Sequence, residues 1–153
     1  MSTELSVAYC AGLFDGEGCV AVYLFPKQFS VSLSLNNTDF RLPLAMYEVF
    51  EGRVSTNTGR DKKRAQAVWT VRTKRAVSVA RALLPYSISK HDQLELLLQL
   101  EPYVDVYYKA LSPNDLQICK SLTERIAELK RVDWESHASR AGIDSLILGL
   151  AEV

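Results

Sequence analysis

The chain has 153 residues, of which 48% are hydrophobic and 24% are charged, as is typical of one globular domain with a substantial core. No apolar run reaches the ~18 residues of a membrane helix, and no basic segment followed by an apolar one opens the chain, so we expect an intracellular protein that is neither secreted nor membrane-bound. The formal net charge of zero argues, taken alone, against a nucleic-acid partner.

The charges are nevertheless segregated along the chain. Residues 1–52 carry two basic and six acidic side chains, residues 53–90 carry ten and one, and residues 91–153 carry six and eleven. The middle segment therefore creates a local positive field, which predicts a polyanionic partner. The cysteines are odd in number and lack paired spacing, so free thiols are expected rather than a disulfide framework or a zinc site. They are Cys10, Cys19 and Cys119.

The first half of the chain predicts a helix followed by a β-hairpin. Residues 3–17 place small and apolar residues at helical spacing until glycines end the helix. Residues 19–25 are β-branched and aromatic, and residues 29–35 alternate strictly, with a Pro-Lys turn between them. The apolar alternates of the second strand, including Phe29 and Leu35, are expected in the core.

The rest of the chain repeats this order. Further helices are expected over residues 38–51, 74–84, 90–101, 113–131 and 135–151, and a second strand pair over residues 52–58 and 66–72. Trp69 is expected in the core with the apolar alternates of the hairpin. Strand pairs separated by helices predict a single α+β domain over residues 1–153, with an antiparallel four-stranded sheet that carries its helices on one face.

Two carboxylates fall in the last turn of the first helix. Asp15 and Glu17 lie where the helix dipole is negative and the last carbonyls lack intrahelical donors. A divalent cation would make this placement favourable, because Mg²⁺ takes carboxylate and carbonyl oxygens together. The alternative is that Asp15 makes local hydrogen bonds and Glu17 is a solvated turn residue.

The same helix has a face with almost no side chains. Ala8, Gly12 and Gly16 follow one another at intervals of four residues, which allows a second helix to approach closely. Since the chain has one such segment, its partner would be a second copy, giving a two-fold dimer. The alternative is that this face packs against the domain's own sheet.

The nine residues CAGLFDGEG, from Cys10 to Gly18, resemble the LAGLIDADG signature of homing endonucleases at seven of nine positions, with Phe for Ile and Glu for Asp counted as conservative. The departures are Cys10 for leucine and Gly16 for alanine. The resemblance, to the single-motif homodimeric branch, implies an αββαββα core with a saddle-shaped sheet. It also implies a homodimeric, metal-dependent endonuclease that makes a staggered double-strand break in a long pseudo-palindromic DNA site, serves intron or gene homing, and works in bacterial cytoplasm or an organelle.

The resemblance also implies the chemical roles of several residues. Glu17 and the Gly16 carbonyl match the ligands of the metal, which is Mg²⁺ or Mn²⁺. Asp15 matches an acid whose role is more structural: it stands at the dimer interface and is a less favoured metal ligand. Asn37, Arg41 and Lys90 match positions that border the active site, although the family more often has Gln at the position of Asn37. Lys90 has a second interpretation as a solvated residue at a helix start, and His91 is a weaker candidate for a general base.

Side chains that point away from the helices are the expected contacts to double-stranded DNA, because the major groove admits a two-stranded ribbon. The expected base contacts are Tyr23, Lys27, Gln28, Ser30, Ser32, Ser34, Ser55, Asn57, Gln66, Thr70 and Arg72. The expected phosphate contacts are Arg53, Arg60, Lys62, Lys63 and Arg64. Two alternatives remain: an RNA maturase or DNA-binding regulator that keeps the saddle but does not cut, and an unrelated α+β domain in which DGEG is a turn.

Overall fold

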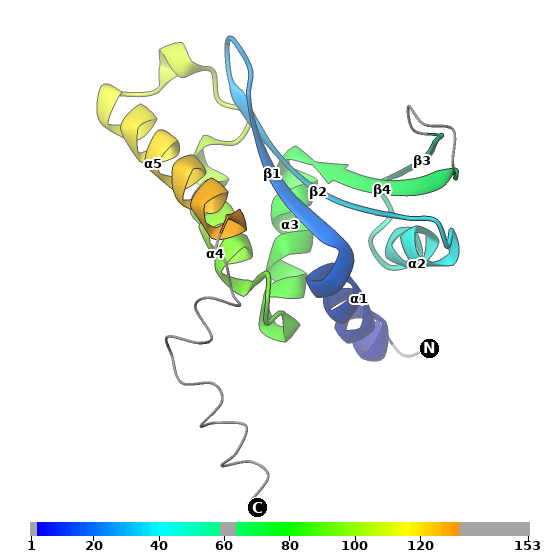
Figure 1. Ribbon diagram of the computed structural model, residues 1–153. Helices are drawn as coiled ribbons and strands as arrows, with labels where there is room; N and C mark the ends of the chain where they lie inside the picture. Colours follow the sequence, from blue (N-terminus) through cyan, green and yellow to red (C-terminus); the bar gives the residue numbers. More distant parts are fainter. Residues whose placement is uncertain (1–2, 59–63, 132–153) are drawn as a thin grey trace, which may run out of the picture.

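The computed structural model describes residues 3–58 and 64–131 (Figure 1). Its helices are α1 (Thr3–Glu17), α2 (Arg41–Phe50), α3 (Thr73–Leu83), α4 (His91–Gln99) and α5 (Pro113–Lys130), with short 3-10 turns η1 (Leu84–Tyr86), η2 (Glu101–Tyr103) and η3 (Tyr108–Ala110). Its strands are β1 (Gly18–Leu24), β2 (Phe29–Asn37), β3 (Arg53–Asn57) and β4 (Gln66–Arg72). Among these residues no helix is long and apolar enough to cross a membrane.

The four strands form one antiparallel sheet in the order β1-β2-β4-β3. The two hairpins are therefore joined through their second strands, β2 and β4. Ser32 pairs with Arg72 at one end of this ladder, and Asn37 pairs with Ala67 at the other. In Figure 1 the sheet is bent and all five labelled helices lie on one side of it. The α+β architecture expected from the sequence is confirmed, and no helix in the described part of the chain covers the opposite side of the sheet.

The core fills the space between the sheet and the helices. Phe29, Leu35 and Trp69 are buried there, as the alternation of their strands predicts. The indole Nε1 of Trp69 donates to the Glu51 carbonyl at 2.7 Å, so its one polar atom is satisfied. Cys10 is also buried, and this burial raises the pKa of its thiol to about 11.

Two boundaries differ from the expected ones for local reasons. The helix expected from residue 38 begins at Arg41, because Asn37 and Asp39 form two successive side-chain turns: the Asp39 N–H donates to Asn37 Oδ1 at 2.8 Å and the Arg41 N–H to Asp39 Oδ1 at 3.1 Å. The helix expected over residues 90–101 ends at Gln99, and Pro102 follows in η2. The helix expected over residues 135–151 lies outside the described residues.

Candidate active site and nucleic-acid interface

Asp15 ties the end of α1 to the segment that precedes α4. Its carboxylate accepts the backbone N–H groups of Ile88 at 2.7 Å and Lys90 at 3.1 Å. Its backbone carbonyl accepts from Ser89 Oγ at 2.8 Å and from Lys90 Nζ at 3.3 Å. Both carboxylate oxygens are therefore engaged within the chain, an arrangement suited to a structural acid.

Glu17 is the last residue of α1 and is exposed, as is Gly16. Among the residues that the structure describes, its carboxylate has no hydrogen-bond or ion-pair partner. A partnerless carboxylate at the negative end of a helix, one residue after an exposed glycine, is a donor set that suits a hard divalent cation. The residues present thus fit the metal expected at this position, through Glu17 and the Gly16 carbonyl.

Gly18 makes the step from helix to strand immediately after Glu17. A Cβ at this position would run into the ring of the buried Phe14, so the close approach requires glycine. The strand that follows therefore starts one residue after the proposed metal ligand, without an intervening loop. This fixes Glu17 between the helix and the sheet.

Arg41 lies in the first turn of α2 and is paired with Asp39. The Asp39 carboxylate accepts Arg41 Nε at 2.9 Å and Nη2 at 2.7 Å, and the Arg41 side chain is 88% exposed. Hydrogen bonds that the Arg41 guanidinium and the Arg41 backbone N–H donate to the carboxylate hold the pKa of Asp39 at about 2, well below its usual value. The Asp39 carboxylate thus orients the Arg41 guanidinium through two parallel hydrogen bonds.

A pocket of about 410 Å³ lies beside the end of α1, where β1 begins, α4 begins and α5 ends. The residues that line this pocket, here called the Lys90 pocket, are Asp15, Gly18, Cys19, Ser89, Lys90, Gln93, Leu129 and Lys130. Of the expected site residues, Asp15 and Lys90 meet here. Cys19, Ser89, Gln93 and Lys130 were not among them, and no pattern in the sequence brings residue 130 to residue 19.

Two of these additional residues have distinctive surroundings. Lys130 Nζ lies 3.6 Å from Cys19 Sγ, so an ammonium and a thiol from opposite ends of the chain meet in the pocket. Gln93 is 8% exposed, and its Oε1 is buried without a hydrogen-bond partner in the described structure. A buried amide oxygen without a donor costs free energy.

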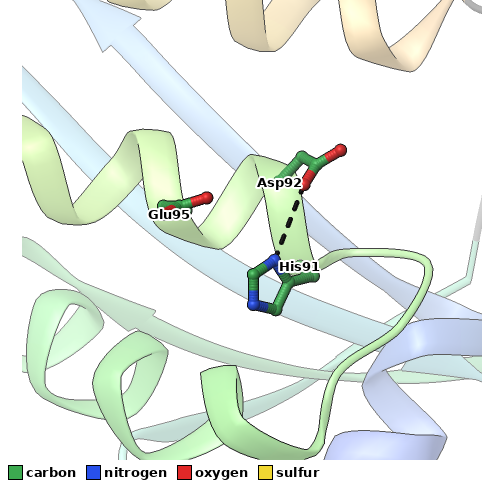
Figure 2. Close-up of side chains that lie close together, drawn as sticks. All are labelled: His91, Asp92 and Glu95. Carbon is green, nitrogen blue, oxygen red and sulfur yellow. Dashed lines mark ion pairs between the residues drawn. The ribbon is translucent and has the colours of Figure 1, made fainter.

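His91, Asp92 and Glu95 form a separate cluster on α4 (Figure 2). Their potential ligand atoms all lie within 4.8 Å of one another, and His91 Nδ1 is 3.5 Å from Asp92 Oδ1. Asp92 and Glu95 are exposed, and none of the three lines the Lys90 pocket. His91 thus pairs with a neighbouring acid at the surface, and its role as a general base stays a prediction.

The strand register brings the expected DNA contacts onto one face of the sheet. Directly paired residues share a face, and the pairs are Tyr23 with Ser30, Ser34 with Thr70, Ser32 with Arg72, Arg53 with Thr70, and Asn57 with Gln66. This face is the one opposite the helices. Asn36 Nδ2 donates to Gln66 Oε1 at 3.0 Å on it, so part of the row is already hydrogen-bonded.

The serines of β2 on this face differ in how exposed their side chains are. Ser30 is 8% exposed and Ser32 is 2% exposed, whereas Ser34 is half-buried. Serine is short, and β2 is flanked by Tyr23 on β1 and Arg72 on β4, whose longer side chains are exposed. In the free protein Ser30 and Ser32 therefore offer little surface for contact, and their expected role as base contacts stays a prediction.

Three arginines gather at the β3 and β4 side of the sheet. A pocket of about 450 Å³ is lined by Gly52, Arg53, Ser55, Thr70, Val71, Arg72 and Arg75. Arg75 was not among the expected contacts, and its guanidinium pairs with Glu51 at 3.0 Å. Arg64 and Lys27 are exposed, while Gln28 is half-buried in the hairpin turn. Arg60, Lys62 and Lys63 lie outside the described residues.

No sequence model of a known family and no curated protein sequence matches this chain. Solved structures do match its fold. The homing endonuclease I-CvuI, in complex with its target in the presence of Ca, has a TM-score of 0.64 at 19% sequence identity, over 86% of this chain and 85% of that one. The archaeal intron-encoded homing endonuclease I-Vdi141I, complexed with DNA, has a TM-score of 0.67 at 14% identity, over 84% of this chain and 86% of that one.

Proposed function

We propose that this chain, whose fold is that of the LAGLIDADG-type homing endonucleases, is a homodimeric, divalent-metal-dependent DNA endonuclease that makes a staggered double-strand break in a long pseudo-palindromic site. The observation that carries the proposal is the partnerless, exposed carboxylate of Glu17 at the end of α1, which stands in the chain between Asp15 and Gly18, two residues that line the Lys90 pocket. A protein that only bound nucleic acid would gain nothing from a carboxylate facing phosphate.

The residues around Glu17 have complementary tasks in this proposal. Glu17 and the Gly16 carbonyl would hold Mg²⁺ or Mn²⁺, which, when bound, acidifies a water and offsets charge on the leaving oxygen. Lys90, whose Nζ is held at the Asp15 carbonyl, stabilises negative charge on the phosphate. Arg41 and Asn37 stand at the entry to α2, where Arg41 exchanges its bond to Asp39 for one to a phosphate oxygen.

The dimer is supported by the surface of α1 and its surroundings. Gly12 and Gly16 are exposed, and a Cβ built on either meets no atom within 4 Å. The half-buried Ala8 continues this face, which suits a second helix at close range. Ile88, 89% exposed, adjoins the end of α1 through its N–H bond to Asp15, and such a residue suits burial against a partner.

DNA recognition is assigned to the polar face of the sheet. Tyr23, Lys27, Asn57, Gln66 and Thr70 would contact bases with Gln28, Ser34, Ser55 and Arg72, while Arg53 and Arg64 would contact phosphates. Ser30 and Ser32 stay in the proposal as small residues that let the bases approach the sheet. Arg60, Lys62 and Lys63 complete the expected phosphate contacts.

The experiment compares the native chain with Glu17→Gln on DNA carrying a randomised or native flanking site, with Mg²⁺. We expect the native protein to cut both strands and the variant to bind with similar affinity but to lose at least about a hundredfold in cleavage rate, since the metal ligand is removed. Cleavage is followed on gels, and binding by fluorescence anisotropy.

Glu95→Gln is the matched control, because it removes an exposed acid of the α4 cluster instead. We expect it to cleave like the native protein. Binding without any cleavage by the native chain would reject the nuclease in favour of the maturase or regulator, and loss of cleavage in Glu95→Gln alone would move the metal to the α4 cluster.

A further inference from the structure

The pocket at the β3 and β4 side of the sheet, here called the arginine pocket, contains a basic residue to which the proposed function gives no task. Arg53, Arg72 and Arg75 line this pocket, whose volume is about 450 Å³. Arg53 and Arg72 belong to the polar face of the sheet and are proposed to contact DNA. Arg75 comes from the first turn of α3 instead. The arginine pocket therefore joins the start of a helix to the proposed DNA surface.

Arg75 forms an ion pair with Glu51. Its Nη2 lies 3.0 Å from Glu51 Oε2, and the Arg75 and Glu51 side chains are 52% and 72% exposed. Among the described residues, Glu51 is the only acid that forms an ion pair with an arginine of this pocket. An ion pair this exposed contributes little net stability. A phosphate offers a guanidinium two oxygens, as a carboxylate does, so a phosphate can replace Glu51 at Arg75.

The backbone at Glu51 is a second observation that points to a role for its side chain. Glu51 has φ 57° and ψ −144°, a conformation that favours glycine. Its carbonyl accepts the indole N–H of Trp69 at 2.7 Å, which holds the chain in this turn. The next residue, Gly52, lines the arginine pocket. A glutamate thus stands at a strained position directly before a pocket residue, and strain of this kind is characteristic of functional sites.

We propose that the arginine pocket binds one phosphate of the DNA backbone, and that Glu51 competes with this phosphate by occupying Arg75 until DNA displaces the carboxylate. Arg53 from β3 and Arg75 from α3 hold the phosphate, beside the Arg72 side chain that is proposed to contact bases. The ion pair imitates the contact between arginine and phosphate and thereby lowers the affinity for DNA. This inference rests on the DNA binding of the proposed function and not on cleavage.

The competition is tested by fluorescence anisotropy on the full chain, with a duplex of random sequence and without divalent metal, so that no strand is cut. Glu51→Gln should bind the duplex severalfold more tightly than the native protein, because Arg75 is released. Arg75→Gln should bind roughly fivefold more weakly at low salt. Its slope of log affinity against log salt should be smaller by about one, since one phosphate contact is lost.

Two neighbouring residues supply matched controls. Glu48→Gln removes an exposed acid of α2 and Lys74→Gln an exposed base of α3, and neither residue lines the arginine pocket. In the Arg75→Gln background, the gain from Glu51→Gln should shrink to that of Glu48→Gln, because Glu51 acts through Arg75. A gain that persists undiminished there, or an equal salt slope in Arg75→Gln and Lys74→Gln, would overturn the proposal.

The pocket is tested without DNA by titrating pyrophosphate into protein with isotope-labelled arginines and following the NMR signals of their Nε–H groups. We expect the signals of Arg53 and Arg75 to shift, and to do so at severalfold lower pyrophosphate concentration in Glu51→Gln. Arg81, which pairs with Glu101 and does not line the pocket, is the internal control. Equal shifts at Arg81 and Arg75, or no shift at Arg75, would refute the site. A protein that binds no duplex at all would instead refute the proposed function, and the titration would still decide whether the pocket binds phosphate.

Discussion

At the scale of single residues, Asp15 shows how one side chain organises a site. The segment Ile88 to Lys90 donates four hydrogen bonds to it, two to its carboxylate and two to its carbonyl. These bonds position Lys90 although it lies 75 residues further along the chain. Asp15 is thereby a positioning residue for Lys90.

Replacing Asp15 by alanine should lower the free energy of unfolding by about 1–2 kcal/mol, because the N–H groups of Ile88 and Lys90 lose their acceptors. Urea denaturation measures this change. Glu48→Ala, which removes an exposed acid of α2, should stay within about 0.5 kcal/mol of the native protein. If the two variants had equal free energies of unfolding, the hydrogen bonds to the Asp15 carboxylate would make no net contribution to stability.

Sequence alone predicted some of these residues and could not predict others. Asp15 and Glu17 lie in the nine-residue motif, and the resemblance to the homing endonucleases implied their roles and that of Lys90. Lys130 and Cys19 are separated by 111 residues, and only the packing of α5 brings them together. The burial of Ser30 and Ser32 was missed as well, because alternation predicts which face a residue is on but not the reach of its neighbours.

At the scale of elements, α1 combines a buried face with an exposed one of small residues. Cys10, Ala11 and Phe14 are buried against the domain, while Gly12 and Gly16 are exposed. The spacing of small and apolar residues in α1 predicted this helix. The neighbouring helix α2 begins later than expected, because the side-chain turns at Asn37 and Asp39 compete with a helix for the same N–H groups.

Gly12→Leu should convert the proposed dimer into monomers, because a leucine side chain keeps the two helices apart. Light scattering measures the mass. Gly12→Ala fits the free space around this position in the isolated protomer and should raise its stability by about 1 kcal/mol. Ser121→Leu, at an exposed position of α5, is the control that should leave the mass unchanged. A dimer that persists in Gly12→Leu would reject the interface.

At the scale of the whole molecule, the segregation of charge in the sequence becomes a spatial arrangement. Arg53, Arg72 and Arg75 gather in one pocket at the β3 and β4 side of the sheet. The net charge of zero thus conceals a basic region beside the polar face, where a polyanion would be attracted despite the neutral total.

DNA affinity should consequently fall steeply as salt concentration rises. Arg53→Gln should reduce the slope of log affinity against log salt by about one, since one phosphate contact is lost. Lys120→Gln, which removes an exposed charge from α5, should leave the slope unchanged. Anisotropy titrations at several salt concentrations measure both. Identical slopes for the two variants would remove Arg53 from the phosphate contacts.

The direct junction of α1 and β1 has a geometric consequence. Since β1 starts at Gly18, the residue after Glu17, and Gly18 packs against Phe14, no flexible hinge separates the proposed dimer helix from the proposed reading surface. In the proposed assembly, the angle between the two α1 helices would set the distance between the two cleavage positions on the DNA. A change in that angle should therefore alter the length of the single-stranded overhangs before it alters the DNA sequence that is recognised.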